Sequence, residues 1–189
     1  VGVRWIRTWS IRKGYLDHPN ERSSHENPTP RGGGLVISAV TLAAYIGSSW
    51  VLDYKLSLGF IAGALLIVSV SWLDDVVSLS FGWRLLVHLV AAAAVIADVG
   101  YFEELSIPFV EAPLHLGVFG MVISLILIAW FVNAYNFMDG IDGLAGIQAV
   151  AAGLGWLLIG ILMDIPTATV IGGVVLFSSV GFLIHNWQP

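Results

Sequence analysis

The sequence predicts an all-α membrane protein, a polytopic bundle of about six transmembrane helices. Of its 189 residues, 57% are hydrophobic and only 11% are charged, and the mean hydropathy is +0.86. Soluble domains contain about 45–50% apolar and about 25% charged residues. The composition therefore excludes a soluble enzyme and a disordered chain. The sequence has no cysteine, which excludes disulfides and thiolate metal sites.

Six apolar stretches approach the roughly 20 residues that a helix needs to cross a bilayer. They cover residues 35–52, 56–73, 85–102, 116–132, 143–163 and 167–184. The stretches are rich in Gly, Ala and Ser, and small residues allow helices to approach closely in lipid. We therefore divide the chain into an N-terminal arm, residues 1–34, and a transmembrane bundle, residues 35–189.

The basic residues set the expected orientation, because cytoplasmic loops of membrane proteins are enriched in Lys and Arg. The arm carries six of the eight basic residues, namely Arg4, Arg7, Arg12, Lys13, Arg22 and Arg31. With a cytoplasmic arm, six crossings place loops 74–84 and 133–142 and the C-terminal end on the cytoplasmic side too. Arg84 then joins the inside set, and Lys55 is the one basic residue outside. We expect the two loops to meet beside the arm.

Two adjacent carboxylates, Asp74 and Asp75, follow the second apolar stretch. Like charges at a membrane boundary are unfavourable, and a helix C-terminus disfavours negative charge further. A divalent cation or a role in proton transfer would compensate. The structural alternative is that Asp75 caps a following helix while Asp74 faces water.

A second polar segment separates the fourth and fifth stretches. Asn133–Gly143 reads N-x-x-N-x-x-D-G-x-D-G and so places two amides and two carboxylates close together. Such oxygen donors suit Mg²⁺, which shares its ligands with phosphates. Asp142 also has a structural interpretation as the N-cap of the next helix. Capping leaves Asn133, Asn136 and Asp139 unexplained.

The arm contains a third segment, His25-x-x-Pro28-Thr29-Pro30-Arg31-Gly32-Gly33-Gly34. Its glycines leave backbone N–H groups open to an anion, and Arg31 and His25 are candidates for phosphate contacts. The alternative is a solvated linker whose basic residues attract anionic lipid. His88, inside the third apolar stretch, is interpreted as a satisfied packing histidine rather than a functional intramembrane group.

Together these segments resemble the polyprenyl-phosphate N-acetylhexosamine-1-phosphate transferases, which are of the glycosyltransferase family 4 type. Asn133–Gly143 matches a signature of that family, and Asp74-Asp75 matches its acidic pair. The segment from His25 to Gly34 is similar to the branch that initiates O-antigen or other surface polysaccharides. It is less similar to the branch that makes the peptidoglycan lipid precursor.

The resemblance implies transfer of a sugar 1-phosphate from a UDP-N-acetylhexosamine to undecaprenyl phosphate, with release of UMP and a requirement for Mg²⁺ or Mn²⁺. It implies that Asp74 and Asp75 bind the metal or deprotonate the lipid phosphate, with the division between them open. The other implied site residues are Asn136 and Asp139 for metal and diphosphate, Asn133 and Asp142 for the nucleotide, and His25 and Arg31 for substrate phosphate. The catalytic set is thus Asp74, Asp75, Asp139 and Asp142, and the metal set is Asn136, Asp74 and Asp75.

The implied location is the bacterial plasma membrane, with the active face cytoplasmic and the product serving lipopolysaccharide or other cell-wall synthesis. Membrane lipids are expected partners, nucleic acid is not, and the small residues of the spans would permit a homodimer. Full-length members of the family have a span before the arm, and a further essential Asp with a His-containing loop after a segment like residues 186–189. We expect these 189 residues to be an interior portion of such an enzyme and to be inactive alone.

Two other classes of protein stay open. A transporter would carry carboxylates near the bilayer midplane on broken helices, whereas these carboxylates follow the inner ends of spans. A non-catalytic homologue would lack the acidic motif expected downstream of Pro189.

Overall fold

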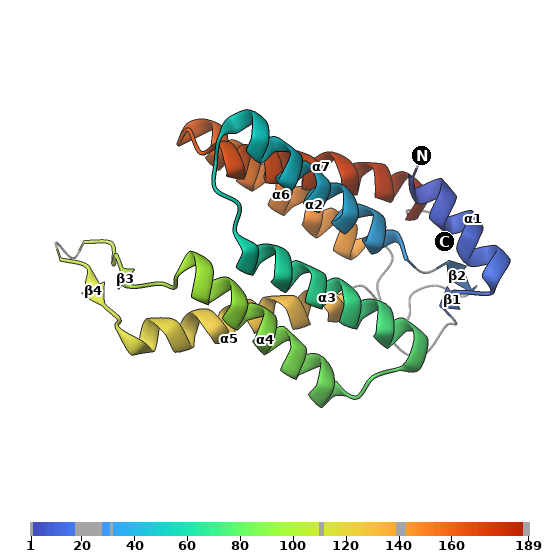
Figure 1. Cartoon of the computed structure of the whole chain (residues 1–189), viewed down its shortest axis with the longest axis horizontal. Coiled ribbons are helices and arrows are strands. Elements are labelled where there is room, and N and C mark those ends of the chain that lie inside the picture. The colour runs from blue at the N-terminus through green and yellow to red at the C-terminus, as the bar shows by residue number, and fades with distance from the viewer. Residues whose placement is uncertain (1, 18–27, 31, 110–111, 139–142, 187–189) are drawn as a thin grey trace. The chain divides into compact units, whose positions relative to one another are not determined.

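The computed structural model describes residues 2–17, 28–30, 32–109, 112–138 and 143–186 (Figure 1). Within these residues the fold is helical, as predicted, and its strands are limited to two short pairs. Strand β1 (Leu16–Asp17) pairs with β2 (Thr29–Pro30), and β3 (Glu104–Leu105) pairs with β4 (Leu114–His115), both antiparallel. The helices are α1 (Gly2–Lys13), α2 (Gly33–Leu52), α3 (Leu58–Val77), α4 (Phe81–Val99), α5 (Val118–Met138), α6 (Leu144–Leu162) and α7 (Pro166–Asn186).

Helices α2 to α7 are each long and apolar enough to cross a membrane. They coincide with the six predicted stretches, which confirms a multi-pass bundle. Two of them extend further than the apolar residues do. Helix α3 continues through Asp74 and Asp75 to Val77, and α5 continues through Asn133 and Asn136 to Met138. Hydropathy marks the end of an apolar run, whereas the helix ends only where its backbone hydrogen bonding stops.

The arm contains a helix that its hydropathy does not indicate. Helix α1 carries Arg12 and Lys13 in its last turn, where cations interact favourably with the helix dipole. Trp5 is exposed, whereas Ser10 is fully buried. After α1, the chain enters the β1–β2 pair, which brings the two ends of the proline-containing segment of the arm together.

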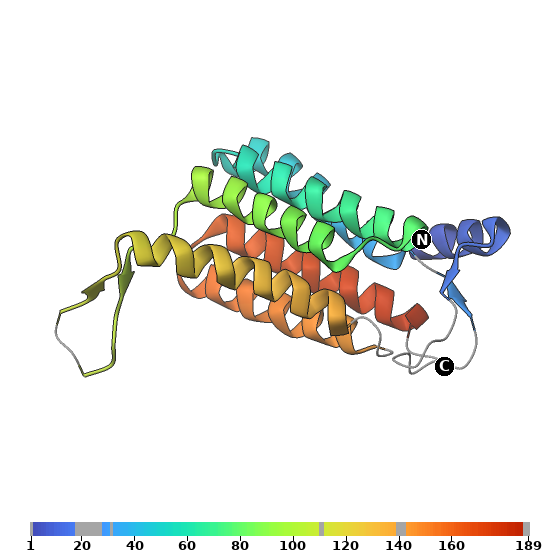
Figure 2. The same ribbon diagram turned by 90° about the horizontal axis from the view of Figure 1, so that it is seen from below.

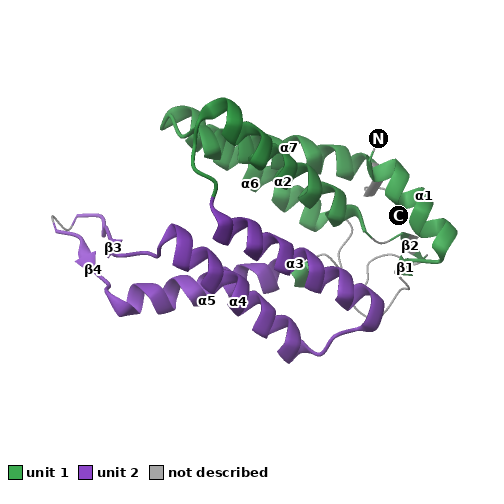
Figure 3. Cartoon of the chain, viewed as in Figure 1, with its two compact units in different colours: residues 1–56, 136–189 green, residues 57–135 purple. Residues whose placement is uncertain are grey.

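The chain divides into two compact units (Figure 3). Unit 1 comprises residues 1–56 and 136–189, and its helix α7 packs against both α6 and α2. Glycines at a seven-residue spacing line the α7-facing side of α6, and such a spacing keeps them on one helix face. They are Gly146, Gly153 and Gly160. A Cβ atom on Gly153 would lie 2.5 Å from the backbone nitrogen of Leu176. The close contact between α6 and α7 therefore depends on these positions being glycine, which has no side chain.

Unit 2 comprises residues 57–135 and is built on the antiparallel pair α3 and α4, which lie side by side in both views (Figures 1 and 2). A Cβ atom on Gly59 would collide with the carbonyl oxygen of Ala94. The Asp98 carboxylate accepts hydrogen bonds from Ser57 Oγ at 2.7 Å and from the Gly59 amide at 2.8 Å. These bonds tie the start of α3 to the end of α4.

A hairpin formed by β3 and β4 follows α4 and leads into α5. The Ser124 hydroxyl of α5 accepts a hydrogen bond of 3.0 Å from the Phe102 amide and donates one of 2.8 Å to the Gly120 carbonyl. A Cβ atom on Gly120 would collide with the Phe102 carbonyl oxygen. The backbone around Phe102 therefore lies directly against the backbone of α5 at this point. The alternating direction of α3, α4 and α5 places the end of α3, the start of α4 and the end of α5 on one side of unit 2 (Figures 1 and 2).

Candidate active site

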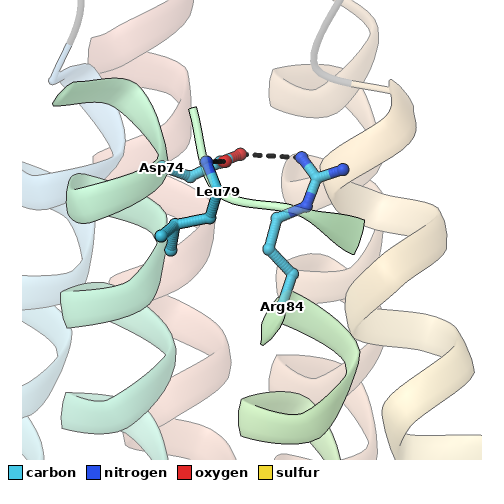
Figure 4. A network of polar contacts seen from close by, with 3 residues as sticks. All are labelled: Asp74, Leu79 and Arg84. Carbon is cyan, nitrogen blue, oxygen red and sulfur yellow. Dashed lines mark hydrogen bonds and ion pairs between the residues drawn. The ribbon is translucent and has the colours of Figure 1, made fainter. Parts of the chain in front are cut away.

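Asp74, the first of the two predicted carboxylates, accepts three hydrogen bonds at the end of α3. The backbone carbonyl of Asp74 accepts a hydrogen bond of 2.9 Å from the Ser78 amide, with Ser78 in the left-handed conformation at φ 50°. The Asp74 carboxylate accepts one bond of 2.7 Å from the Leu79 amide through Oδ1. Through Oδ2 it accepts another of 2.7 Å from Arg84 Nη1 (Figure 4). Asp74 therefore joins the end of α3 to the first turn of α4.

The ion pair between Arg84 and Asp74 is partly screened from solvent, with side-chain exposures of 29% and 21%. A charge-assisted hydrogen bond in this setting is stronger than one at an open surface. The structural alternative for Asp74, a carboxylate facing water, is therefore wrong. The cap assigned to Asp75 is wrong too, because Ser80 occupies the cap position of α4. From the sequence, Arg84 was interpreted only as one of the basic residues that set the orientation in the membrane. The signal that could have indicated the ion pair is the position of Arg84, which follows the acidic pair closely in the sequence.

Asp75 occupies a different position from Asp74, although the two are adjacent. Consecutive residues of an α-helix project about 100° apart, since one turn takes about 3.6 residues. Asp74 points to α4 and Asp75 is exposed. The acidic pair thus presents one carboxylate fixed by the protein and one carboxylate accessible from outside.

The two predicted amides lie on the last turns of α5 rather than in a loop. Asn133 and Asn136 are three residues apart, a spacing that places side chains on one helix face. Asn133 is partly buried and belongs to unit 2. Asn136 is exposed and belongs to unit 1. Of the two amides, Asn133 is therefore the one that shares a unit with Asp74 and Asp75.

Four predicted site residues lie outside the described part of the chain, namely His25, Arg31, Asp139 and Asp142. Met138 and Gly143, which border residues 139–142, are described. Gly143, at φ 74°, takes the left-handed conformation immediately before α6, which glycine adopts without steric cost. Gly143 occupies the cap position of α6.

Fold and site together define a class of protein: a multi-pass membrane protein with a paired acidic site at the end of a helix. Comparison with known proteins narrows this class. A sequence profile for glycosyl transferase family 4 matches residues 57–189, and the chain belongs to that family.

Curated relatives agree with the assignment. The chain is 30% identical, over 97% of its length, to a probable undecaprenyl-phosphate N-acetylglucosaminyl 1-phosphate transferase of Bacillus subtilis. It is 34% identical, over 74% of its length, to an undecaprenyl-phosphate α-N-acetylglucosaminyl 1-phosphate transferase of Yersinia pestis. It is 32% identical, over 97%, to a decaprenyl-phosphate N-acetylglucosaminephosphotransferase of Mycolicibacterium smegmatis. The chain covers 51%, 38% and 50% of these three proteins, about half their length or less.

Proposed function

We propose that the protein, in its full-length form, transfers an N-acetylhexosamine 1-phosphate from a UDP-sugar to undecaprenyl phosphate. The similarity to transferases of N-acetylglucosamine 1-phosphate supports the group transferred and the polyprenyl acceptor. The observation that carries the proposal is the arrangement of Asp74, Asp75 and Arg84 at one end of the α3–α4 pair. A transporter would need such charges near the middle of a span.

The proposed reaction exchanges one phosphoanhydride bond for another. An oxygen of undecaprenyl phosphate attacks the phosphorus that carries the sugar. The bond from this phosphorus to the oxygen that bridges it to the nucleotide breaks, and UMP leaves with the electron pair. Both reactants are anions, so catalysis rests on positioning them and on neutralising their charge. Arg84 places a fixed cation beside Asp74, and the ion pair keeps the end of α3 in one orientation.

The residues present fit Mg²⁺. This ion prefers oxygen ligands and is usually held by one or two carboxylates together with substrate phosphates. No cluster of three or more Asp, Glu, His or Cys occurs among the residues that the structure describes, and a site shared with substrate does not need one. We assign the ligand on α3 to Asp75, because its side chain is exposed at the end of the helix whereas that of Asp74 is partly screened from solvent. Asn136 would add an amide oxygen. When bound, Mg²⁺ would offset the negative charge of the reacting phosphates.

The remaining assignments complete the proposed site. Asp139 would serve the metal and diphosphate, Asn133 and Asp142 the nucleotide, and His25 and Arg31 the substrate phosphate. We place the active face in the cytoplasm of a bacterium, where the UDP-sugar is made, and the product at the start of a surface polysaccharide such as O-antigen. Assays with two donors test this branch: we expect UDP-N-acetylglucosamine to be used and UDP-N-acetylmuramoyl-pentapeptide to be refused. The opposite preference would assign the protein to peptidoglycan synthesis.

Metal removal is expected to abolish transfer. Membranes that contain the full-length protein should lose activity in excess EDTA and regain it when Mg²⁺ is added beyond the chelator, with Mn²⁺ as a substitute. The measurement is release of UMP from the UDP-sugar in the presence of undecaprenyl phosphate. EDTA saturated with Mg²⁺ beforehand serves as the control. A full rate in free EDTA would contradict a metal-dependent site.

Replacement of Arg84 is expected to affect both stability and activity. Arg84→Ala leaves a partly buried carboxylate on Asp74 without its cation, which should cost about 1–2 kcal/mol, between the values for exposed and buried pairs. Arg84→Lys keeps the charge and should retain more activity than Arg84→Ala does. Thermal unfolding in detergent and the transfer rate are the two measurements. Lys55→Ala, which removes an exposed cation elsewhere, is the control. Equal activity of Arg84→Ala and the wild type would remove Arg84 from the site.

A further inference from the structure

A buried histidine lies one helical turn beyond Arg84 on α4. His88 is 3% exposed, and its Nδ1 atom has no hydrogen-bond partner among the described residues. The expectation of a satisfied packing histidine is therefore half correct: the ring is packed, but this nitrogen is not satisfied. Buried polar atoms without partners are uncommon in native proteins, and each calls for an explanation.

Arg84 has an unsatisfied atom of its own. Its Nη1 bonds Asp74, whereas its Nε is buried and has no partner in the part of the chain that the structure describes. The two unsatisfied atoms are complementary, because an arginine Nε–H only donates and the unprotonated nitrogen of a neutral imidazole accepts.

Helix geometry places the two residues on one face of α4, one turn apart. Residues four apart lie on the same helix face, and helical side chains lean toward the N-terminus of their helix. Arg84 accordingly extends toward Asp74 (Figure 4), and the imidazole of His88 extends in the same direction, into the turn that the arginine leaves. A buried water that bridges two such groups is a common feature of protein interiors.

We propose that His88 is a positioning residue for Arg84. Its Nδ1 accepts a hydrogen bond from a buried water, and the same water accepts a hydrogen bond from the Nε–H group of Arg84. The guanidinium plane is thereby fixed and Nη1 stays on Asp74. His88 lies deeper in the span and acts only through Arg84. Its effect on catalysis rests on the proposed function, whereas its effect on the arginine does not.

Two replacements of His88 separate a hydrogen-bonding role from a packing role. His88→Asn keeps an acceptor near the position of Nδ1, and His88→Leu fills similar space without one. In the full-length enzyme we expect His88→Leu to lower kcat about tenfold, the lower range for loss of a supporting contact, with little change in the KM values. His88→Asn should restore kcat to within about threefold of the wild type on the same reasoning.

A double replacement tests the route through Arg84. Arg84→Lys keeps a cation for Asp74 but has no Nε–H group of its own. If His88 acts through that group, His88→Leu should have no further effect on kcat in the Arg84→Lys background. A full tenfold loss in that background would overturn the proposal, because the two residues would then act independently.

A spectroscopic measurement tests whether His88 fixes Arg84 and does not require an activity assay. The ¹⁵N signal of Arg84 Nε can be assigned as the one that disappears in Arg84→Lys. We expect its proton to exchange slowly with solvent in the wild type and in His88→Asn, and rapidly in His88→Leu. Ser179→Ala, which removes another buried and unpartnered polar atom, should leave the signal unchanged. Slow exchange in His88→Leu would overturn the proposal, whether or not the enzyme transfers phosphate.

Discussion

Replacing Asp75 with asparagine is expected to lower the rate of sugar-phosphate transfer by at least about a hundredfold, the loss typical of removing one charged or polar group that acts on the transition state. The substitution keeps the shape of the side chain and removes its negative charge. Asp75 is exposed at the end of α3. Its replacement should therefore leave thermal stability within about 0.5 kcal/mol of the wild type.

Asp164→Asn provides a matched control. Asp164 is exposed just after α6 and has a φ of 53°, a left-handed conformation that Asn also tolerates. The same chemical change there should leave the transfer rate unaltered. If Asp75→Asn at equal protein level kept the wild-type rate, Asp75 would not be a metal ligand or a base.

Replacement of Gly153 and of Gly155 by alanine is expected to change stability in opposite directions. Alanine is favoured over glycine inside a helix by about 1 kcal/mol. At Gly155 nothing lies within 4 Å of the added Cβ atom, so this gain should appear in full. At Gly153 the Cβ atom would lie 2.5 Å from the Leu176 nitrogen and 2.9 Å from the Gly172 carbonyl oxygen. Helix α7 must then move away, at a cost of about 1–3 kcal/mol.

Thermal unfolding in detergent, followed by circular dichroism, measures both variants. We expect the midpoint to fall for Gly153→Ala and to stay level or rise for Gly155→Ala. The two positions share a helix and differ only in whether they face α7. A fall of equal size at both would mean that close packing of α6 on α7 does not limit stability.

The sequence was sufficient to predict the helical bundle and its spans, because a long run of apolar residues identifies a membrane helix. It was not sufficient to predict where the helices end. The last turns of α3 and α5 are polar, and backbone hydrogen bonds continue through Asp75 and Asn136 regardless of hydropathy. Helix α1 was not predicted for a related reason, because its polar residues resemble those of a linker.

The site was predictable in its residue types but not in its contacts. Asp74 and Asp75 look equivalent in the sequence, and only the α3–α4 turn shows that Arg84 and Leu79 hold Asp74. The link between Asp74 and Arg84 joins two helices across a sharp turn, and no periodic pattern encodes it. The unsatisfied nitrogen of His88 likewise depends on its surroundings, which residue type alone does not reveal.

The central claim is that a sugar phosphate, rather than a sugar, is transferred to the lipid. It is tested most directly with purified full-length protein, undecaprenyl phosphate and UDP-N-acetylglucosamine labelled with ³²P in the phosphate that carries the sugar. We predict that the label moves into the lipid fraction and that one UMP appears for each labelled lipid. Retention of the label in released UDP, or no consumption of the donor, would contradict the proposed reaction.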